Sequence, residues 1–210
     1  MSGRFSDPQR LVYSAVLEAQ IAVMGMMRPG EYLYEMYEYF IVMCFYLMCS
    51  PSPAPCTLLG VSWVDCHLLA ERVILSSLLD IGILHSTSVD TLVQAELGAV
   101  FLPHGLGHLI GCDTHDVGGY ISGTPDRPTR NGLKKLRTAR ILEVGMVLTV
   151  EPGLYFIEYL LNTALANPKQ SVYIDKNILS QYRAFGGVRL EDDVVVTDTG
   201  IDNWTLCPRR

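Results

Sequence analysis

Two apolar patterns divide this 210-residue chain near Gly98 and limit the folds open to it. Upstream, apolar residues recur at every fourth position from Leu11 to Met27, which predicts a helix with one buried face. Downstream, short β-branched or aromatic runs are bounded by Gly, Pro or Asp, which predicts strands at residues 99–102, 146–150, 154–157 and 194–197. Helices followed by antiparallel strands indicate an α+β fold.

Local signals set the expected helix boundaries. Asp7 is predicted to cap the first helix with Pro8 at the first helical position, and a Pro-Gly pair at 29–30 ends it. A second helix is predicted over residues 66–79, stopping near Gly82, and a short third helix over 89–97.

An apolar segment between the first two helices does not fit this pattern. Residues 40–49 (FIVMCFYLMC) are all apolar and precede a Pro- and Ser-rich stretch. A membrane-spanning helix needs about 20 apolar residues, so this run is too short to cross a bilayer. The favoured interpretation is a poorly ordered or misfit insert over about residues 39–64, the alternative being a buried helix.

Charge and cysteine content exclude several classes of protein. The net charge is −6 without a basic block, which argues against nucleic-acid binding. The polar first ten residues predict no signal peptide, and the six cysteines match no zinc-binding spacing. We therefore expect reduced thiols, a cytoplasmic location and no membrane partner.

Histidines and carboxylates cluster in glycine-rich surroundings after Gly98. His104 and His108 flank Gly-Leu-Gly, His115 precedes Asp-Val-Gly-Gly, Glu151 ends an apolar run, and Glu191 follows Gly-Gly-Val-Arg-Leu. Glycines allow a close backbone approach, and neutral imidazole with carboxylates suits a divalent cation such as manganese. Solvated loop histidines and surface glutamates are the alternative reading.

For His67 and His85 the solvated reading is preferred, since neither lies in such a cluster.

Five segments in order carry a family resemblance: PHGLGH, HDVGGY, LRTAR, GMVLTVEPGLYFI and FGGVRLEDDVVVT. Together they resemble the prolidases, the Xaa-Pro dipeptidases of metallopeptidase family M24, which have the pita-bread fold. The resemblance covers residues 6–28 and then 66 to the end, but not 40–64. Methionine aminopeptidases and aminopeptidases P share the fold and the ligand set, whereas LRTAR and HDVGGY favour prolidase.

The resemblance implies a role for each residue that matches a family motif. His108, Glu151 and Glu191 would bind metal, with Glu191 bridging two ions and Glu151 also serving as general base. His104 and His115 would contact the substrate and stabilise the tetrahedral intermediate. Arg137 would bind the C-terminal carboxylate of the dipeptide, and Arg189 would order the site and contact substrate.

The resemblance also implies what this chain lacks. The family holds two Mn²⁺ ions with two further aspartates upstream of the first helix, and it has an N-terminal domain. Neither is expected in this chain, which is therefore predicted to be an incomplete catalytic domain. At most one ion, weakly held, is expected here.

The implied activity is hydrolysis of dipeptides that end in Pro or hydroxyproline. One alternative is a catalytically impaired chain that pairs with itself or with full-length prolidase, or a non-functional product. A weaker alternative is an enzyme like aminopeptidase P.

Overall fold

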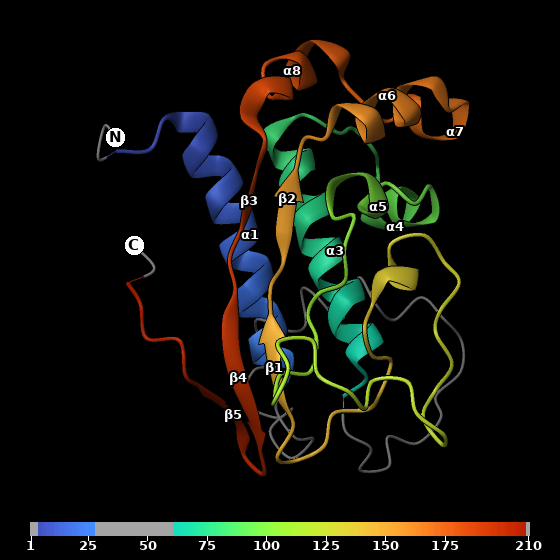
Figure 1. The fold of residues 1–210 in the computed structure, drawn as a ribbon. Coiled ribbons are helices and arrows are strands. Elements are labelled where there is room, and N and C mark those ends of the chain that lie inside the picture. Colours follow the sequence, from blue (N-terminus) through green and yellow to red (C-terminus); the bar gives the residue numbers. More distant parts are fainter. Residues whose placement is uncertain (1–3, 28–60, 209–210) are drawn as a thin grey trace.

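The computed structural model describes residues 4–27 and 61–208. Its helices are α1 (Asp7–Met26), α3 (Trp63–Ile81), α4 (Val89–Gln94), α5 (Gly98–Phe101), α6 (Glu158–Ala166), α7 (Pro168–Ser171) and α8 (Lys176–Ser180). Its strands are β1 (Val147–Val150), β2 (Gly153–Tyr155), β3 (Gly187–Arg189), β4 (Asp192–Thr197) and β5 (Gly200–Asn203). Figure 1 shows α1 and α3 side by side along one face of the strands, with α6–α8 gathered at one end. No helix in the described ranges is long and apolar enough to cross a bilayer.

The strands form two consecutive antiparallel ladders. β1, β4 and β5 form one sheet in the order β1-β4-β5, and β2 pairs with β3. In the register, Val150 lies opposite Asp192 and Gly153 lies opposite Arg189. Residues 151–152 connect β1 to β2, and residues 190–191 connect β3 to β4. These two short connections lie opposite each other in the antiparallel register. The predicted α+β class is confirmed.

The start of α1 differs from the prediction. Ser6, not Asp7, is the N-cap: its side chain accepts from the Gln9 amide, and the Gln9 side chain accepts from the Ser6 amide. This reciprocal pair is a capping box. Asp7 is already helical and pairs with Arg10. The buried face also differs slightly, because Val12 and Val16 are buried whereas Leu11 is exposed.

Helix α3 begins earlier than expected and ends where expected. Its N-cap is Ser62, and the Trp63 side chain is fully buried. Gly82 terminates the helix with φ 84°, a left-handed conformation that glycine adopts without strain. Residues 61–64, which were counted at the end of the predicted insert, form the start of α3 and the segment before it. The rest of the predicted insert, residues 39–60, lies outside the described part of the chain.

The predicted strand at 99–102 is wrong, because these residues belong to helix α5 and the turn after it. A run of four apolar residues is too short to distinguish a strand from a buried helical turn. Phe101 is fully buried and its ring centroid lies 6.1 Å from that of Phe156. Helices α6–α8, between β2 and β3, were not predicted either.

His67 is not solvated, contrary to the prediction. It lies on the buried face of α3 with 1% of its surface exposed, and its Nδ1 has no hydrogen-bond partner among the described residues. Burial lowers the pKa of His67 to about 3, and the charges of His104 and Arg130 add to this effect. The imidazole is therefore neutral at physiological pH. His85 is exposed, as predicted.

The depressed pKa of His67 predicts a loss of stability in acid. An unfolded His takes up a proton near pH 6.5, whereas folded His67 does so only near pH 3. The unfolded state therefore binds more protons between these values, and the free energy of unfolding falls as pH falls. Between pH 7 and pH 5, His67 accounts for about 2 kcal/mol of the decrease in the free energy of unfolding.

Urea denaturation of wild type and His67→Leu at pH 7 and pH 5 measures this share. The variant should lose about 2 kcal/mol less on acidification. His85→Gln is the matched control and should retain the wild-type difference. An identical pH dependence in His67→Leu would contradict the assignment.

Candidate metal centre

The segment that carries His108 lies antiparallel to β1. The Glu151 amide donates to the Leu106 carbonyl at 2.7 Å, and the Thr149 amide donates to the His108 carbonyl at 3.0 Å. Leu109 forms an isolated bridge with Leu148. These backbone contacts place His108 beside the end of β1, where Glu151 begins the break in the ladder.

Gly107 makes this close pairing possible. A Cβ at Gly107 would lie 1.9 Å from the Thr149 carbonyl oxygen, which belongs to the backbone and cannot rotate away. Trp63 covers the same peptide, because its indole Nε1 donates to the Gly107 carbonyl at 3.4 Å. Only glycine fits here.

His108, Glu151 and Glu191 converge on one point. Each offers a ligand atom, and these atoms all lie within 4.8 Å of one another, although the residues are 43 and 40 positions apart in sequence. His108 and Glu151 are buried, and Glu191 is exposed. The convergence expected from the order of the motifs is present in the structure.

Hydrogen bonds orient the two buried ligands. His108 Nδ1 lies 2.9 Å from the Leu109 carbonyl, to which it donates, and Nε2 faces Glu151 Oε1 at 3.3 Å. Thr149 Oγ1 donates to Glu151 Oε1 at 3.2 Å and accepts from the His108 amide at 3.1 Å. One imidazole nitrogen and two carboxylates directed at one point fit a divalent cation.

The carboxylate of Glu151 is held in a balance of opposing charges. Burial raises its pKa, and the neighbouring Glu191 raises it further. Arg189, His108 and the Thr149 hydroxyl act in the opposite direction, and Arg189 Nη1 donates to Glu151 Oε2 at 2.6 Å. A cation between Glu151 and Glu191 would remove the repulsion between the two carboxylates.

His104 is linked to this centre through Tyr155. Arg189 Nε donates to the Tyr155 hydroxyl at 2.7 Å, and that hydroxyl lies 3.0 Å from His104 Nε2. His104 Nδ1 lies 2.7 Å from the Gly105 carbonyl, so Nδ1 carries the proton and Nε2 accepts from Tyr155. Burial lowers the pKa of His104 to about 4. His104 is thus neutral near pH 7 and orients Tyr155.

Tyr155 was missed from the sequence. It lies between two glycines in space: a Cβ at Gly153 or at Gly187 would come within 2.5 Å of its ring. Gly153 is visible next to Glu151 in the sequence, but Gly187 lies opposite Tyr155 only in the β2–β3 register. The sequence signal for Tyr155 was therefore Gly153, which closely follows Glu151.

His115 and Arg137 lie on the open side of the centre. The ring centroid of His115 is 4.4 Å from that of His108, and both His115 and Arg137 are exposed. Partial desolvation is the main cause that lowers the pKa of His115, and the positive charge of Arg137 lowers it further. Arg137 therefore lies near enough to His115 to interact with it electrostatically.

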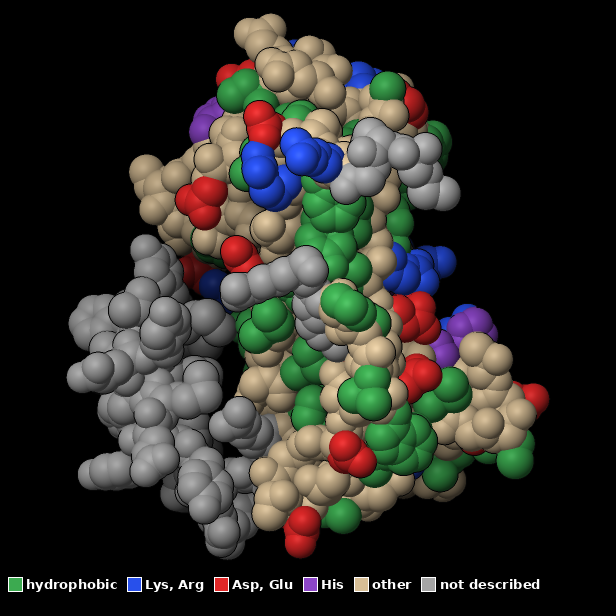
Figure 2. All heavy atoms as spheres, turned by 90° about the vertical axis from the view of Figure 1, so that its left-hand side faces the viewer, with side chains coloured by type: hydrophobic (Ala, Val, Ile, Leu, Met, Phe, Trp, Pro, Cys, Tyr) green, Lys and Arg blue, Asp and Glu red, His purple; other side chains and the backbone are tan. Residues whose placement is uncertain are grey.

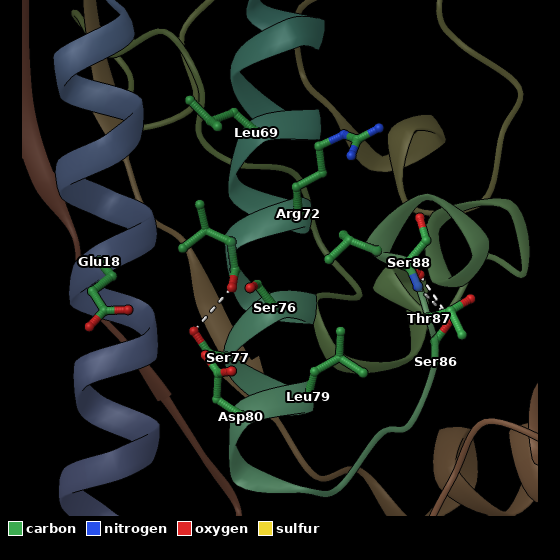
Figure 3. Close-up of a pocket in the computed structure, with 12 residues that line it drawn as sticks. Glu18, Leu69, Arg72, Ser76, Ser77, Leu79, Asp80, Ser86, Thr87 and Ser88 are labelled. Atoms are coloured by element: carbon green, nitrogen blue, oxygen red, sulfur yellow. Dashed lines mark hydrogen bonds between the residues drawn. The ribbon is translucent and has the colours of Figure 1, made fainter. Parts of the chain in front are cut away.

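A separate hollow of about 470 Å³ lies between α1, α3 and the segment before α4. Figure 3 shows Glu18 of α1 on one side and Arg72, Ser76 and Asp80 of α3 on the other. It shares no lining residue with the metal centre.

Comparison with known proteins defines the class. Residues 56–198 match metallopeptidase family M24, and the chain belongs to that family. The chain is 48% identical to human Xaa-Pro dipeptidase over 208 residues, and 47% identical to the rat protein. Each alignment covers 99% of the chain but 36% of the relative, so the chain spans about a third of these proteins.

Solved structures agree with this assignment. Pseudomonas aeruginosa aminopeptidase PepP superposes with TM-score 0.60 at 31% identity, covering 96% of this chain and 32% of its own. Zinc-substituted Escherichia coli aminopeptidase P in complex with product gives TM-score 0.59 at 30% identity, with the same coverage. The predicted pita-bread type of fold is confirmed. The roles of the individual site residues remain predictions.

Gly107→Ala should disrupt the centre. The added methyl must push the His108 segment away from β1, which should cost about 1–3 kcal/mol of folding free energy. It should also weaken Mn²⁺ binding by roughly tenfold or more, a change of about 1.4 kcal/mol or more, because His108 moves relative to Glu151. Loss of the free Mn²⁺ EPR signal on titration measures the affinity.

Gly25→Ala is the matched control, since a Cβ there meets nothing within 4 Å. In a helix this change should stabilise by about 0.5–1 kcal/mol and leave Mn²⁺ affinity unchanged. Equal Mn²⁺ affinity in Gly107→Ala and wild type would show that the close pairing does not position His108.

Proposed function

We propose that this chain supplies part of the active site of a manganese-dependent Xaa-Pro dipeptidase that hydrolyses dipeptides ending in Pro or hydroxyproline. The observation that carries the proposal is the convergence of His108, Glu151 and Glu191 in a chain 48% identical to human Xaa-Pro dipeptidase. A cytoplasmic location is part of the same proposal.

His108, Glu151 and Glu191 would hold the cation, which would supply Lewis-acid polarisation of the scissile carbonyl. Glu151 would accept the proton of the attacking water. Burial raises the pKa of this carboxyl group, which favours its uptake of a proton. Arg189 and Thr149 fix the two oxygens of this carboxylate, so that the proton is taken up at a defined position.

Arg137 would recognise the C-terminal carboxylate of the dipeptide. Within residues 4–27 and 61–208 its guanidinium makes no hydrogen bond or ion pair, so its donors are available. A planar guanidinium binds a carboxylate through two parallel hydrogen bonds. His115, on the same open side, would contact the peptide between Arg137 and the cation.

The three protein ligands that converge within residues 4–27 and 61–208 suit one ion better than two. Hard divalent cations prefer about six ligand atoms, and three side chains leave half of these positions open. We therefore propose that this chain alone binds one Mn²⁺ weakly.

A second role is pairing with another chain. In the described part of the molecule, β5 pairs with β4 along one edge only. Phe5, Leu11 and Ile21, in and just before α1, are exposed. Figure 2 shows hydrophobic side chains on the side of the molecule that lies at the left in Figure 1. Exposed strand edges and apolar patches recruit partners, so self-association or pairing with full-length prolidase is proposed.

A hydrolysis assay with two proteins tests the proposed function. The first is the purified chain with millimolar Mn²⁺, which should hydrolyse Gly-Pro barely or not at all. The second is human Xaa-Pro dipeptidase in which residues 61–208 of this chain replace the equivalent stretch. This chimera should hydrolyse Gly-Pro, and Glu151→Gln within it should lower kcat by at least about 100-fold.

Three results would contradict parts of the proposal. A folded, Mn²⁺-loaded chimera without activity would contradict the dipeptidase assignment. Cleavage of Gly-Pro-Gly rather than Gly-Pro would favour the reading as an aminopeptidase P. Light scattering on the purified chain decides the pairing role, because a monomer of 23.3 kDa that forms no complex with full-length prolidase would exclude it.

A further inference from the structure

The carbonyl of Leu136, directly before Arg137, is held by two side chains from the preceding loop. Tyr120 donates its hydroxyl to this oxygen at 3.2 Å, and Arg127 donates through Nη1. The guanidinium carbon of Arg127 also lies 4.1 Å from the centroid of the Tyr120 ring. Arg127 therefore stacks on Tyr120 and hydrogen-bonds the same carbonyl that Tyr120 contacts.

The peptides on either side of this carbonyl are also tightly packed. A Cβ at Gly119 would lie 2.0 Å from the Arg137 carbonyl oxygen, and one at Gly105 would lie 2.9 Å from the Leu136 Cα. Thr138 Oγ1 donates to the Gly119 carbonyl at 3.2 Å. The backbone of Leu136 and Arg137 thus runs between Gly105 and Gly119.

The Arg137 side chain contrasts with its fixed backbone. It is exposed and makes no hydrogen bond or ion pair within residues 4–27 and 61–208, whereas Leu136 and Thr138 are buried. The point from which this side chain extends is therefore set by the peptide that carries it. The Arg127–Tyr120 pair holds that peptide from the solvent side.

We infer that Arg127 is a positioning residue that, stacked on Tyr120, fixes the backbone of Arg137 and thereby aims its guanidinium at the substrate carboxylate. This inference rests on the proposed role of Arg137. Arginine suits the task because its flat face can stack on a ring while its edge donates to a carbonyl. Lysine offers a point charge and cannot do both in this geometry.

A first measurement needs no ligand. In the metal-free 210-residue chain, backbone ¹⁵N heteronuclear NOE values of Arg137 and Thr138 should be those of rigid backbone. They should fall in Arg127→Met and in Arg127→Lys, while the thermal midpoint stays close to wild type. Arg183→Met is the matched control, since Arg183 is a surface arginine that pairs with Glu158 and Asn162. Unchanged NOE values in Arg127→Met would overturn the inference.

A second measurement titrates the same proteins with Gly-Pro and with Gly-Pro amide, following the Arg137 Nε–H signal. Wild type should bind Gly-Pro more tightly than the amide. Arg127→Met should weaken Gly-Pro binding by roughly fivefold to tenfold, about 1–1.4 kcal/mol, because the hydrogen bonds of Arg137 to the carboxylate are weakened rather than lost, and should leave the amide unaffected. Arg127→Lys should not restore the affinity.

The outcomes separate the two claims. If wild type does not distinguish Gly-Pro from its amide, the proposed role of Arg137 fails, and the NOE values alone decide whether Arg127 fixes the backbone. If wild type discriminates and Arg127→Met does so equally well, the positioning role fails and the proposed function stands. An equal loss for both ligands would mark a general structural role and would also contradict the inference.

Discussion

The centre depends on one close backbone contact, that of Gly107 with Thr149 of β1. It brings the His108 segment within hydrogen-bonding distance of β1, so that the imidazole and the Glu151 carboxylate meet at 3.3 Å. The break between the two ladders then places Glu191 opposite Glu151. A candidate metal site assembled from three distant segments is in this way set by main-chain pairing, which is far stiffer than side-chain contacts.

Assembling the ligands costs electrostatic free energy, because Glu151 is buried near a second carboxylate. Arg189 offsets part of this cost and is itself fixed by Tyr155, whose hydroxyl is oriented by neutral His104. Hydrogen bonds join four of these groups, Glu151, Arg189, Tyr155 and His104, so a change in any of the other three is transmitted to the Glu151 carboxylate. This explains why residues that do not point at the cation are part of the same site.

The sequence predicted the elements whose signals are local. Gly82 ends α3 as expected, and the motif order correctly indicated that His108, Glu151 and Glu191 meet. Sequence-based prediction failed where the local structure depends on packing. Residues 99–101 of the predicted strand belong to α5, where Phe101 packs on Phe156, and the burial of His67 follows from its position on the inner face of α3. Tyr155 becomes visible only in the β2–β3 register, which no local pattern encodes.

The central claim is that His108, Glu151 and Glu191 hold a single divalent cation. Crystals of the chain grown with Mn²⁺ and measured at the manganese absorption edge test it directly. The account predicts one anomalous peak bounded by His108 Nε2 and by carboxylate oxygens of Glu151 and Glu191, at about 2.0–2.3 Å. Anomalous peaks only at other carboxylates, with these three side chains uncoordinated, would contradict it.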